Sequence, residues 1–273
     1  MLTNAQFKAA FPKGNMGFRL LTPGNPKTEK GKGAGYWTFI LHLAPASLSG
    51  FNVCPMATLG CKAACLNTAG RGGIMAGHGI LTAADVASGI HNTIQKARIR
   101  KTRAFFEHRD VFMATLAKDI ERAMRLARDK GYVPAFRLNG TSDIRWETLG
   151  LNQWGYDFRN VFEAFPTVQF YDYTKIANRK NIPANYALTF SLADGNDAQA
   201  AQALANGMNV AAVFRDKATQ ARYVRDGFTW AGMDVRAVNG DETDLRFLDP
   251  RGVVVALYAK GNARRDQSGF VRD

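Results

Sequence analysis

The chain has 273 residues, of which 46% are hydrophobic, enough to bury the core of one large α/β domain or of two small ones. Its 36 Lys and Arg outnumber its 23 Asp and Glu and give a net charge of +13, which favours an anionic partner, nucleic acid first. No apolar run approaches the roughly 18 residues that span a bilayer, and the N-terminus lacks the apolar core of a secretory signal. These features exclude a membrane-spanning protein and predict a cytoplasmic one.

The first 35 residues are expected to form an N-terminal arm, and residues 36–273 a single α/β domain. The arm begins with a short amphipathic helix, Asn4–Phe11, and continues as a flexible connection rich in Gly, Pro and Lys. The aromatic and β-branched run Tyr36–Leu43 then predicts a buried strand.

Two long helices are predicted after the first strand. One covers residues 82–104, with Thr82 as its N-cap, and the other covers residues 109–130 and ends at Gly131. The second helix has an apolar stripe formed by Phe112, Leu116, Ile120, Met124 and Ala127.

Apolar runs beyond Gly131 predict further strands. They lie at residues 133–138, 167–173, 186–192, 209–214 and 253–258, with a weaker one at 233–238. Helix-compatible segments separate most of them, and this alternation predicts parallel strands joined by right-handed crossovers. We therefore expect a partial or distorted β/α (TIM-like) barrel of about six to seven mostly parallel strands. An open doubly wound sheet is the competing architecture.

All three cysteines, Cys54, Cys61 and Cys65, lie in one short stretch after the first strand. An odd number of thiols cannot all form disulfides, and three thiolates on one loop can hold a soft metal centre with one position left open. A [4Fe-4S] cluster with three cysteine-bound irons is the first hypothesis. Zinc with His78 as fourth ligand is the second, and unligated buried thiols are the third. If a side chain closes the cluster, His42, His78 or an Asp at a strand end is the candidate.

The stretch from Cys54 to Arg71 resembles the signature of a family of uncharacterised bacteriophage proteins, named after a numbered mycobacteriophage gene product. The layout of strand, cysteine loop and barrel also resembles the radical S-adenosylmethionine superfamily, although the cysteine spacing differs from the usual one. This second resemblance implies a [4Fe-4S] cluster whose open iron binds S-adenosylmethionine. It further implies two groups of binding residues. One group binds the amino group or the ribose hydroxyls of that cosubstrate, and the other group binds its carboxylate. The first group is Asn139, Ser142 and Asp143, and the second is Lys175, Arg215 or Lys260.

A cluster of cations in the first long helix predicts contacts with phosphates that are independent of base sequence. Its members are Lys96, Arg100, Lys101 and Arg103. Together these features predict a phage-encoded [4Fe-4S] protein that binds a polyanion such as nucleic acid, or a host protein, in the cytoplasm of the infected cell. The alternatives are a radical S-adenosylmethionine-type enzyme acting on nucleic acid, nucleotide or peptide, and a zinc-stabilised nucleic-acid-binding protein.

Overall fold

The computed structural model describes residues 16–25, 27–230 and 232–273. The arm helix predicted at Asn4–Phe11 lies outside them. In the described part of the arm, β1 (Leu21–Pro23) pairs antiparallel with β2 (Tyr36–Leu41). The residues between them form a 3₁₀ helix, η1 (Thr28–Ala34), and not the flexible connection that the sequence predicts.

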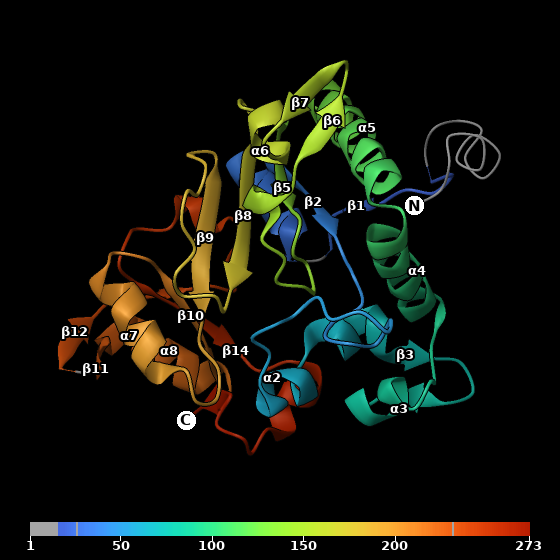
Figure 1. Cartoon of the computed structure of the whole chain (residues 1–273). Coiled ribbons are helices and arrows are strands. Elements are labelled where there is room, and N and C mark those ends of the chain that lie inside the picture. The colour runs from blue at the N-terminus through green and yellow to red at the C-terminus, as the bar shows by residue number, and fades with distance from the viewer. Residues whose placement is uncertain (1–15, 26, 231) are drawn as a thin grey trace.

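The strands form one large sheet in the order β1-β2-β5-β8-β9-β10-β14-β13 (Figure 1). The further strands are β5 (Val133–Arg137), β8 (Gln169–Thr174), β9 (Tyr186–Ser191), β10 (Val210–Phe214), β13 (Ala237–Asn239), β14 (Val254–Tyr258) and β15 (Val271–Arg272). All neighbours except β1 and β2 run parallel. β9 pairs with β10 only at the start of β10, and β15 pairs with β10 at its end. The last two residues of β9 therefore pair with the first two of β10, and β15 pairs with the carboxyl end of β10.

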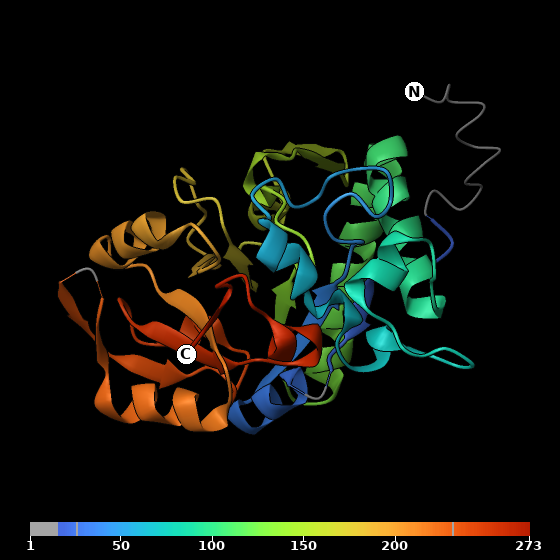
Figure 2. The same cartoon turned by 90° about the horizontal axis from the view of Figure 1, so that it is seen from below.

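The prediction of a partial barrel is wrong, because the sheet does not close. Closure needs a hydrogen-bonded register between the first and last strands, and no pairing joins β1 or β2 to β13 within the described residues. The segment around η1 (blue in Figure 2) bridges these ends instead, through side chains that reach the segment after β13. Lys30 Nζ donates to the carbonyl of Asp241 at 2.9 Å, and Lys27 pairs with Asp244 at 3.4 Å. Phe247 packs between Tyr36 and Tyr171, so side chains that are mostly only partly buried occupy the place of a closing ladder.

Helices cover one face of the sheet. α4 (Thr93–Glu107) and α5 (Arg109–Asp129) lie against the β2, β5 and β8 side, and α7 (Asp197–Ala205) and α8 (Lys217–Asp226) pack on β9, β10 and β14. The stripe predicted for α5 is confirmed: Phe112, Leu116, Ile120 and Ala127 are buried, and Met124 packs against the same core. None of the described helices has the combination of length and apolar composition that a membrane crossing requires.

Short elements complete the fold. They are α2 (Leu59–Ala63), η2 (Leu66–Thr68), η3 (Gly70–Gly73), β3 (Ile74–Met75), β4 (Gly79–Ile80), α3 (Ala83–Ala87), η4 (Trp146–Thr148), β6 (Leu151–Gln153), β7 (Tyr156–Phe158), α6 (Val161–Ala164), β11 (Phe228–Trp230), β12 (Met233–Val235), η5 (Arg246–Leu248) and η6 (Gly261–Arg265). The helix predicted at 82–104 is divided into α3 and α4, since Gly89 adopts a φ of +98° that ends the first helix. Thr82 does cap α3, in a capping box with Asp85. The weak strand predicted at 233–238 is divided between β12 and β13.

Candidate functional site

The cysteine loop, residues 54–65, runs from the end of β2 across the carboxyl end of the sheet (Figure 1). Cys54 opens the loop, α2 carries Cys61, and Cys65 precedes η2. Thr58 starts α2 because its side-chain oxygen accepts a hydrogen bond from the backbone N–H of Cys61 at 3.1 Å. This cap starts the short helix that carries Cys61.

Residues at the ends of β9 and β5 hold the loop in place. The carboxylate of Asp194, just after β9, accepts hydrogen bonds from the hydroxyl of Thr58 and from the backbone N–H of Gly60, the latter at 3.2 Å. The thiol of Cys54 lies 3.8 Å from the carbonyl of Thr141, which follows β5. The loop is thus attached to two separate strand ends of the sheet.

The thiols lie within electrostatic reach of one another. Burial raises the pKa of Cys54 to about 12, and the neighbouring Cys65 and Cys61 raise it further. Burial also raises the pKa of Cys65, with a further rise from Cys61. Without a metal, Cys54 and Cys65 therefore stay protonated near neutral pH and are poor nucleophiles. Each cysteine residue is still partly exposed, so the loop has an accessible side.

Two cations flank Cys65, and both act to lower the pKa of its thiol. Arg98 of α4 donates from Nη1 to the carbonyl of Asn67 at 3.0 Å, while its buried Nε has no hydrogen-bond partner. Lys175, which follows β8, donates from Nζ to the hydroxyl of Ser191 at 2.9 Å. Positive charge is therefore placed where a thiolate-bound centre would be negative.

The residues predicted to bind the amino group or ribose of a cosubstrate have structural partners. Asn139 Oδ1 accepts hydrogen bonds from the Ser142 hydroxyl at 2.8 Å, the backbone N–H of Ile144 at 2.9 Å and Trp146 Nε1 at 3.1 Å. Asp143, whose pKa burial raises, accepts from the backbone N–H of Lys175 at 2.7 Å. These contacts fix the turn after β5.

The three predicted carboxylate-binding cations lie in different places. Lys175 is beside Cys65, as described above. Arg215 follows β10 and pairs with Asp273 at 2.8 Å. Lys260 follows β14 and pairs with Asp241 at 2.5 Å.

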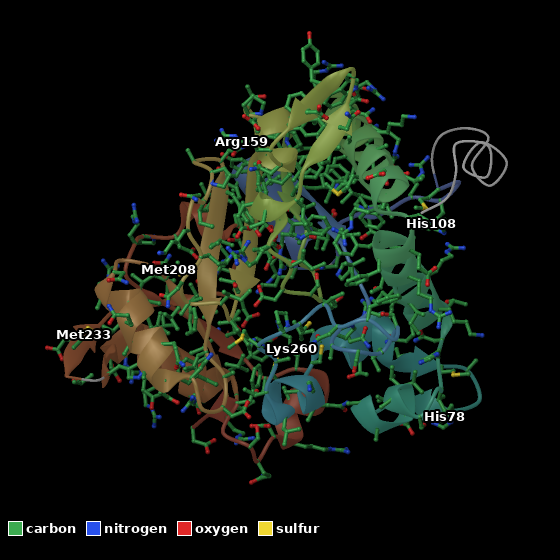
Figure 3. The ribbon with its side chains drawn as sticks, in the orientation of Figure 1. His78, His108, Arg159, Met208, Met233 and Lys260 are labelled. Carbon is green, nitrogen blue, oxygen red and sulfur yellow. The ribbon has the colours of Figure 1, made fainter. Side chains whose placement is uncertain are left out.

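The two histidines considered as metal ligands are not equivalent. His78 lies in the β3–β4 turn beside α3, where it pairs with Asp85 at 3.6 Å (Figure 3). His42 lies just after β2 against Gly140, and burial lowers its pKa to about 3, with Arg98 and Arg137 adding to the effect. It is therefore neutral at physiological pH. Among the described residues no group of three His, Cys, Asp or Glu is placed to hold a single metal ion.

The structure divides the predicted phosphate-binding cations of α4. Lys96, Arg100 and Arg103 are exposed, although the Arg100 guanidinium stacks on Phe18 at 4.1 Å. Lys101 is buried and donates to the carbonyl of Leu20 at 2.6 Å. From residue 30 to residue 106 the sequence contains nine Lys and Arg but a single acid, Asp85. Most of the net positive charge therefore belongs to the segment that carries the cysteine loop.

Sequence analysis did not assign roles at the loop to Arg98 and Asp194. The polar positions Gln95, Arg98 and Thr102 recur at helical spacing, which indicates that this side of α4 faces something polar. Gln95 and Thr102 are indeed buried. Asp194 follows the strand predicted at 186–192, and only this place at a strand end marks it in the sequence.

The fold and the site together define a mostly parallel, open-sheet α/β protein with a three-cysteine loop at the carboxyl ends of its strands. The chain belongs to the family described as Gene product 88, a family of bacteriophage proteins, which it matches over residues 19–273. Neither the curated proteins nor the solved structures include a match to it.

Proposed function

We propose that this chain is an iron–sulfur protein in which Cys54, Cys61 and Cys65 each bind one iron of a [4Fe-4S] cluster. The observation that carries the proposal is the mutual electrostatic influence of the three thiols within one short, anchored loop. Thiolates are the ligands that iron–sulfur clusters prefer, and three of them leave one iron without a cysteine. When bound, such a cluster supplies one-electron transfer.

The donor set favours a cluster over zinc. Structural zinc is enclosed by four donors around one ion, whereas among the described residues no group of three or more His, Cys, Asp or Glu is placed to hold one ion. A cluster distributes its ligands over separate irons and accepts thiols that are further apart. The three cysteines would hold the cluster, and each is partly exposed.

Residues around the loop have defined roles in this proposal. Arg98 and Lys175 offset the negative charge of the thiolates, which favours their deprotonated form. Asp194 holds the first turn of α2, and with it the position of Cys61. A preorganised loop lowers the entropic cost of gathering three ligands.

The test is the iron content and colour of protein purified without oxygen. The wild-type protein is expected to be brown and to carry about four irons per chain. Cys54→Ser, Cys61→Ser and Cys65→Ser should each lose most of the iron, whereas the control His78→Ala should keep it. Unchanged iron and colour in the cysteine variants would overturn the proposal. One zinc per chain, lost in His78→Ala, would favour the zinc alternative.

A second candidate function is a radical S-adenosylmethionine-type reaction at the open iron. The observation in its favour is the ammonium group of Lys175 beside Cys65, which can bind the carboxylate of a cosubstrate. The contacts of Asn139 and Ser142 weigh against it, because their polar atoms are already used. Reduced protein given S-adenosylmethionine should form 5′-deoxyadenosine. A lack of this product in protein with a full cluster would exclude the enzyme.

Nucleic-acid binding in the cytoplasm of the infected host forms part of the proposal. Its support is the exposed cations Lys96, Arg100 and Arg103 in an acid-poor segment. Affinity for duplex DNA should fall by about tenfold or more between roughly 50 and 200 mM salt if several phosphates are contacted. An affinity that does not change with salt would contradict this part.

A further inference from the structure

Exposed apolar side chains gather on the segment that carries the cysteines. We name this segment, residues 54–88, the cysteine lobe; it comprises α2, η2, η3, β3, β4 and α3. Of the nine large hydrophobic residues that are exposed in the described part of the chain, five belong to this lobe. They are Met56, Leu59, Leu66, Ile74 and Ile80, with exposed fractions between 54% and 83%. Single exposed apolar residues are ordinary on a protein surface, whereas a concentration of them marks an interaction site.

The elements that carry these side chains adjoin one another. β3 and β4 form a hairpin in which Ile74 stands directly opposite Ile80, so the two side chains share one face. No third strand pairs with this hairpin among the described residues. α3, which follows β4, lies next to α2, and η2 lies next to η3. The exposed side chains therefore belong to one lobe, seen in the lower part of Figure 1, and not to separate loops.

The charge of the cysteine lobe is positive. Residues 54–84 contain no Asp or Glu, and their two cations, Lys62 and Arg71, are both exposed. The first acid after them, Asp85, accepts a hydrogen bond from the Thr82 hydroxyl at 2.7 Å and pairs with His78. The apolar side chains are thus accompanied by cations and not by carboxylates.

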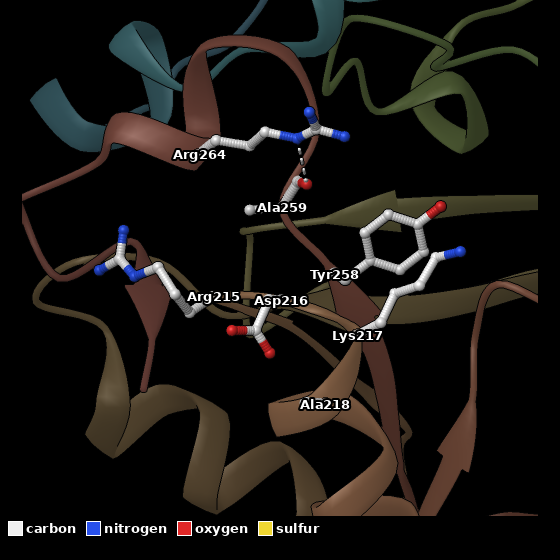
Figure 4. A pocket seen from close by; sticks show the side chains of 7 residues that line it. All are labelled: Arg215, Asp216, Lys217, Ala218, Tyr258, Ala259 and Arg264. Atoms are coloured by element: carbon white, nitrogen blue, oxygen red, sulfur yellow. Dashed lines mark hydrogen bonds between the residues drawn. The ribbon is translucent and has the colours of Figure 1, made fainter.

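η6 adds positive charge beside the lobe. It contacts η2, where Asn262 Nδ2 donates to the Thr68 hydroxyl at 3.1 Å. Arg264, shown on η6 in Figure 4, and Arg265 are both exposed. The neighbouring Asp266 is buried. The cations of η6 therefore continue the basic surface of the cysteine lobe.

Apolar side chains in basic surroundings select the kind of partner. The phosphates of a nucleic acid can pair with the cations but make no contact with apolar side chains, so DNA would leave Leu59 and Ile80 uncovered. A second copy of the chain would bring two basic lobes together, and like charges oppose such a contact. A protein surface with an apolar centre and a rim of carboxylates complements both features.

We propose that the cysteine lobe docks an acidic protein that carries one electron. This inference rests on the proposed function, because the lobe contains the three cysteines that would hold the cluster, and each of them is partly exposed. One electron passes from the reduced carrier to the oxidised cluster, so the carrier is oxidised, the cluster is reduced, and no bond is made or broken. Interfaces of this kind are small, and opposite charge speeds the encounter of the two proteins.

The experiment measures the binding of two acidic electron carriers, a flavodoxin and a [2Fe-2S] ferredoxin, to the full chain with and without iron. Calorimetric titration at low salt should show binding of at least one carrier. Leu59→Ser and Ile80→Ser should each weaken that binding about fivefold or more, because each removes an apolar contact at the centre of the interface. The matched control Tyr156→Ser changes a similarly exposed residue of β7, outside the lobe, and should bind like the wild-type protein.

The contribution of charge is measured separately, by the rate of association. This rate should fall between roughly 50 and 200 mM salt, because salt screens exposed charges. Lys62→Gln and Arg71→Gln should each slow association and make it less dependent on salt. The matched control Lys118→Gln changes an exposed cation of α5 and should leave the rate unchanged.

The proposal is overturned if neither carrier binds, or if Leu59→Ser and Ile80→Ser bind as the Tyr156→Ser control does. It is also overturned if these two variants separate a dimer of the chain, since a second copy would then cover the lobe. Rapid mixing of a bound, reduced carrier with the iron-containing chain should oxidise the carrier, and a carrier that stays reduced would refute electron transfer. Iron content separates the two proposals: a wild-type chain without iron refutes the cluster, whereas an iron-containing chain that binds neither carrier refutes the docking alone.

Discussion

Replacing Gly60 by alanine should disturb the cysteine loop more than any other single methyl group added to α2. A Cβ at position 60 would lie 2.0 Å from the Ser268 hydroxyl and 2.6 Å from a carboxylate oxygen of Asp194. The serine side chain is exposed, but rotating it away breaks its hydrogen bonds with Asp266 at 2.7 Å and with the backbone N–H of Phe270 at 3.2 Å. Asp194 cannot move without loosening its hydrogen bonds to Thr58 and to the backbone of Gly60.

The magnitude follows from those two bonds. A hydrogen bond to a charged group contributes about 1.5–3 kcal/mol, and water replaces part of it because Asp194 is only partly buried. We therefore expect Gly60→Ala to lower the free energy of unfolding by about 2–4 kcal/mol. Cys61, one residue further along α2, should become more reactive as the turn loosens.

Urea denaturation gives the change in stability, and the rate of maleimide labelling reports the exposure of the thiols. The double variant Gly60→Ala with Ser268→Gly removes the contact with serine and keeps the one with Asp194. It should remain destabilised. Full recovery in the double variant, or wild-type stability and labelling in Gly60→Ala alone, would refute the role given to Asp194.

Three further predictions concern buried charges and the basic helix. Burial raises the pKa of Asp172 from an ordinary value of 3.8 to about 7, so the folded protein binds its proton more tightly than the unfolded chain does. The stability that this group contributes is present below about pH 4 and is lost as pH rises through 7. In urea unfolding, the free energy of unfolding of Asp172→Asn should therefore fall less over this pH range than that of the wild-type protein. Asp244→Ala removes the nearer partner of Arg137, at 2.8 Å, and leaves only Asp172 at 3.9 Å. It should cost about 3–5 kcal/mol of unfolding free energy. A loss below about 1 kcal/mol would mean that water or Asp172 compensates the arginine. Lys96→Gln should weaken binding to duplex DNA and make that binding less dependent on salt. Lys101→Gln should lower only the stability of the fold, because Lys101 is buried. Equal losses of DNA affinity in the two variants would contradict this assignment.

The sequence predicted best those helices and strands in which apolar side chains recur at a regular spacing. The stripe of α5 and the strand Tyr36–Leu41 are found where the patterns place them, because side-chain periodicity is a property of neighbouring residues. The long helix predicted at 82–104 breaks because Gly89 takes a left-handed conformation, which the apolar pattern around it does not reveal.

The candidate site was predictable only in part. The three cysteines are neighbours in sequence, so their grouping on one loop could be inferred directly. Asn139 and Ser142 were correctly placed at a strand end, but the pattern could not tell that their polar atoms bind one another. Whether a polar side chain is available to a ligand depends on its partners in space.

The sequence by itself determined an alternating α/β chain, a cysteine loop after the strand at Tyr36–Leu41, and a basic character. Only the tertiary structure decided that the sheet stays open, since the side chains of Asp244 and Phe247 fill the place of a closing ladder. It also decided that Asp194, Arg98 and Lys175 gather around the cysteines. These residues come from segments far apart in the chain, and their meeting depends on how strands and helices pack, which no local pattern encodes.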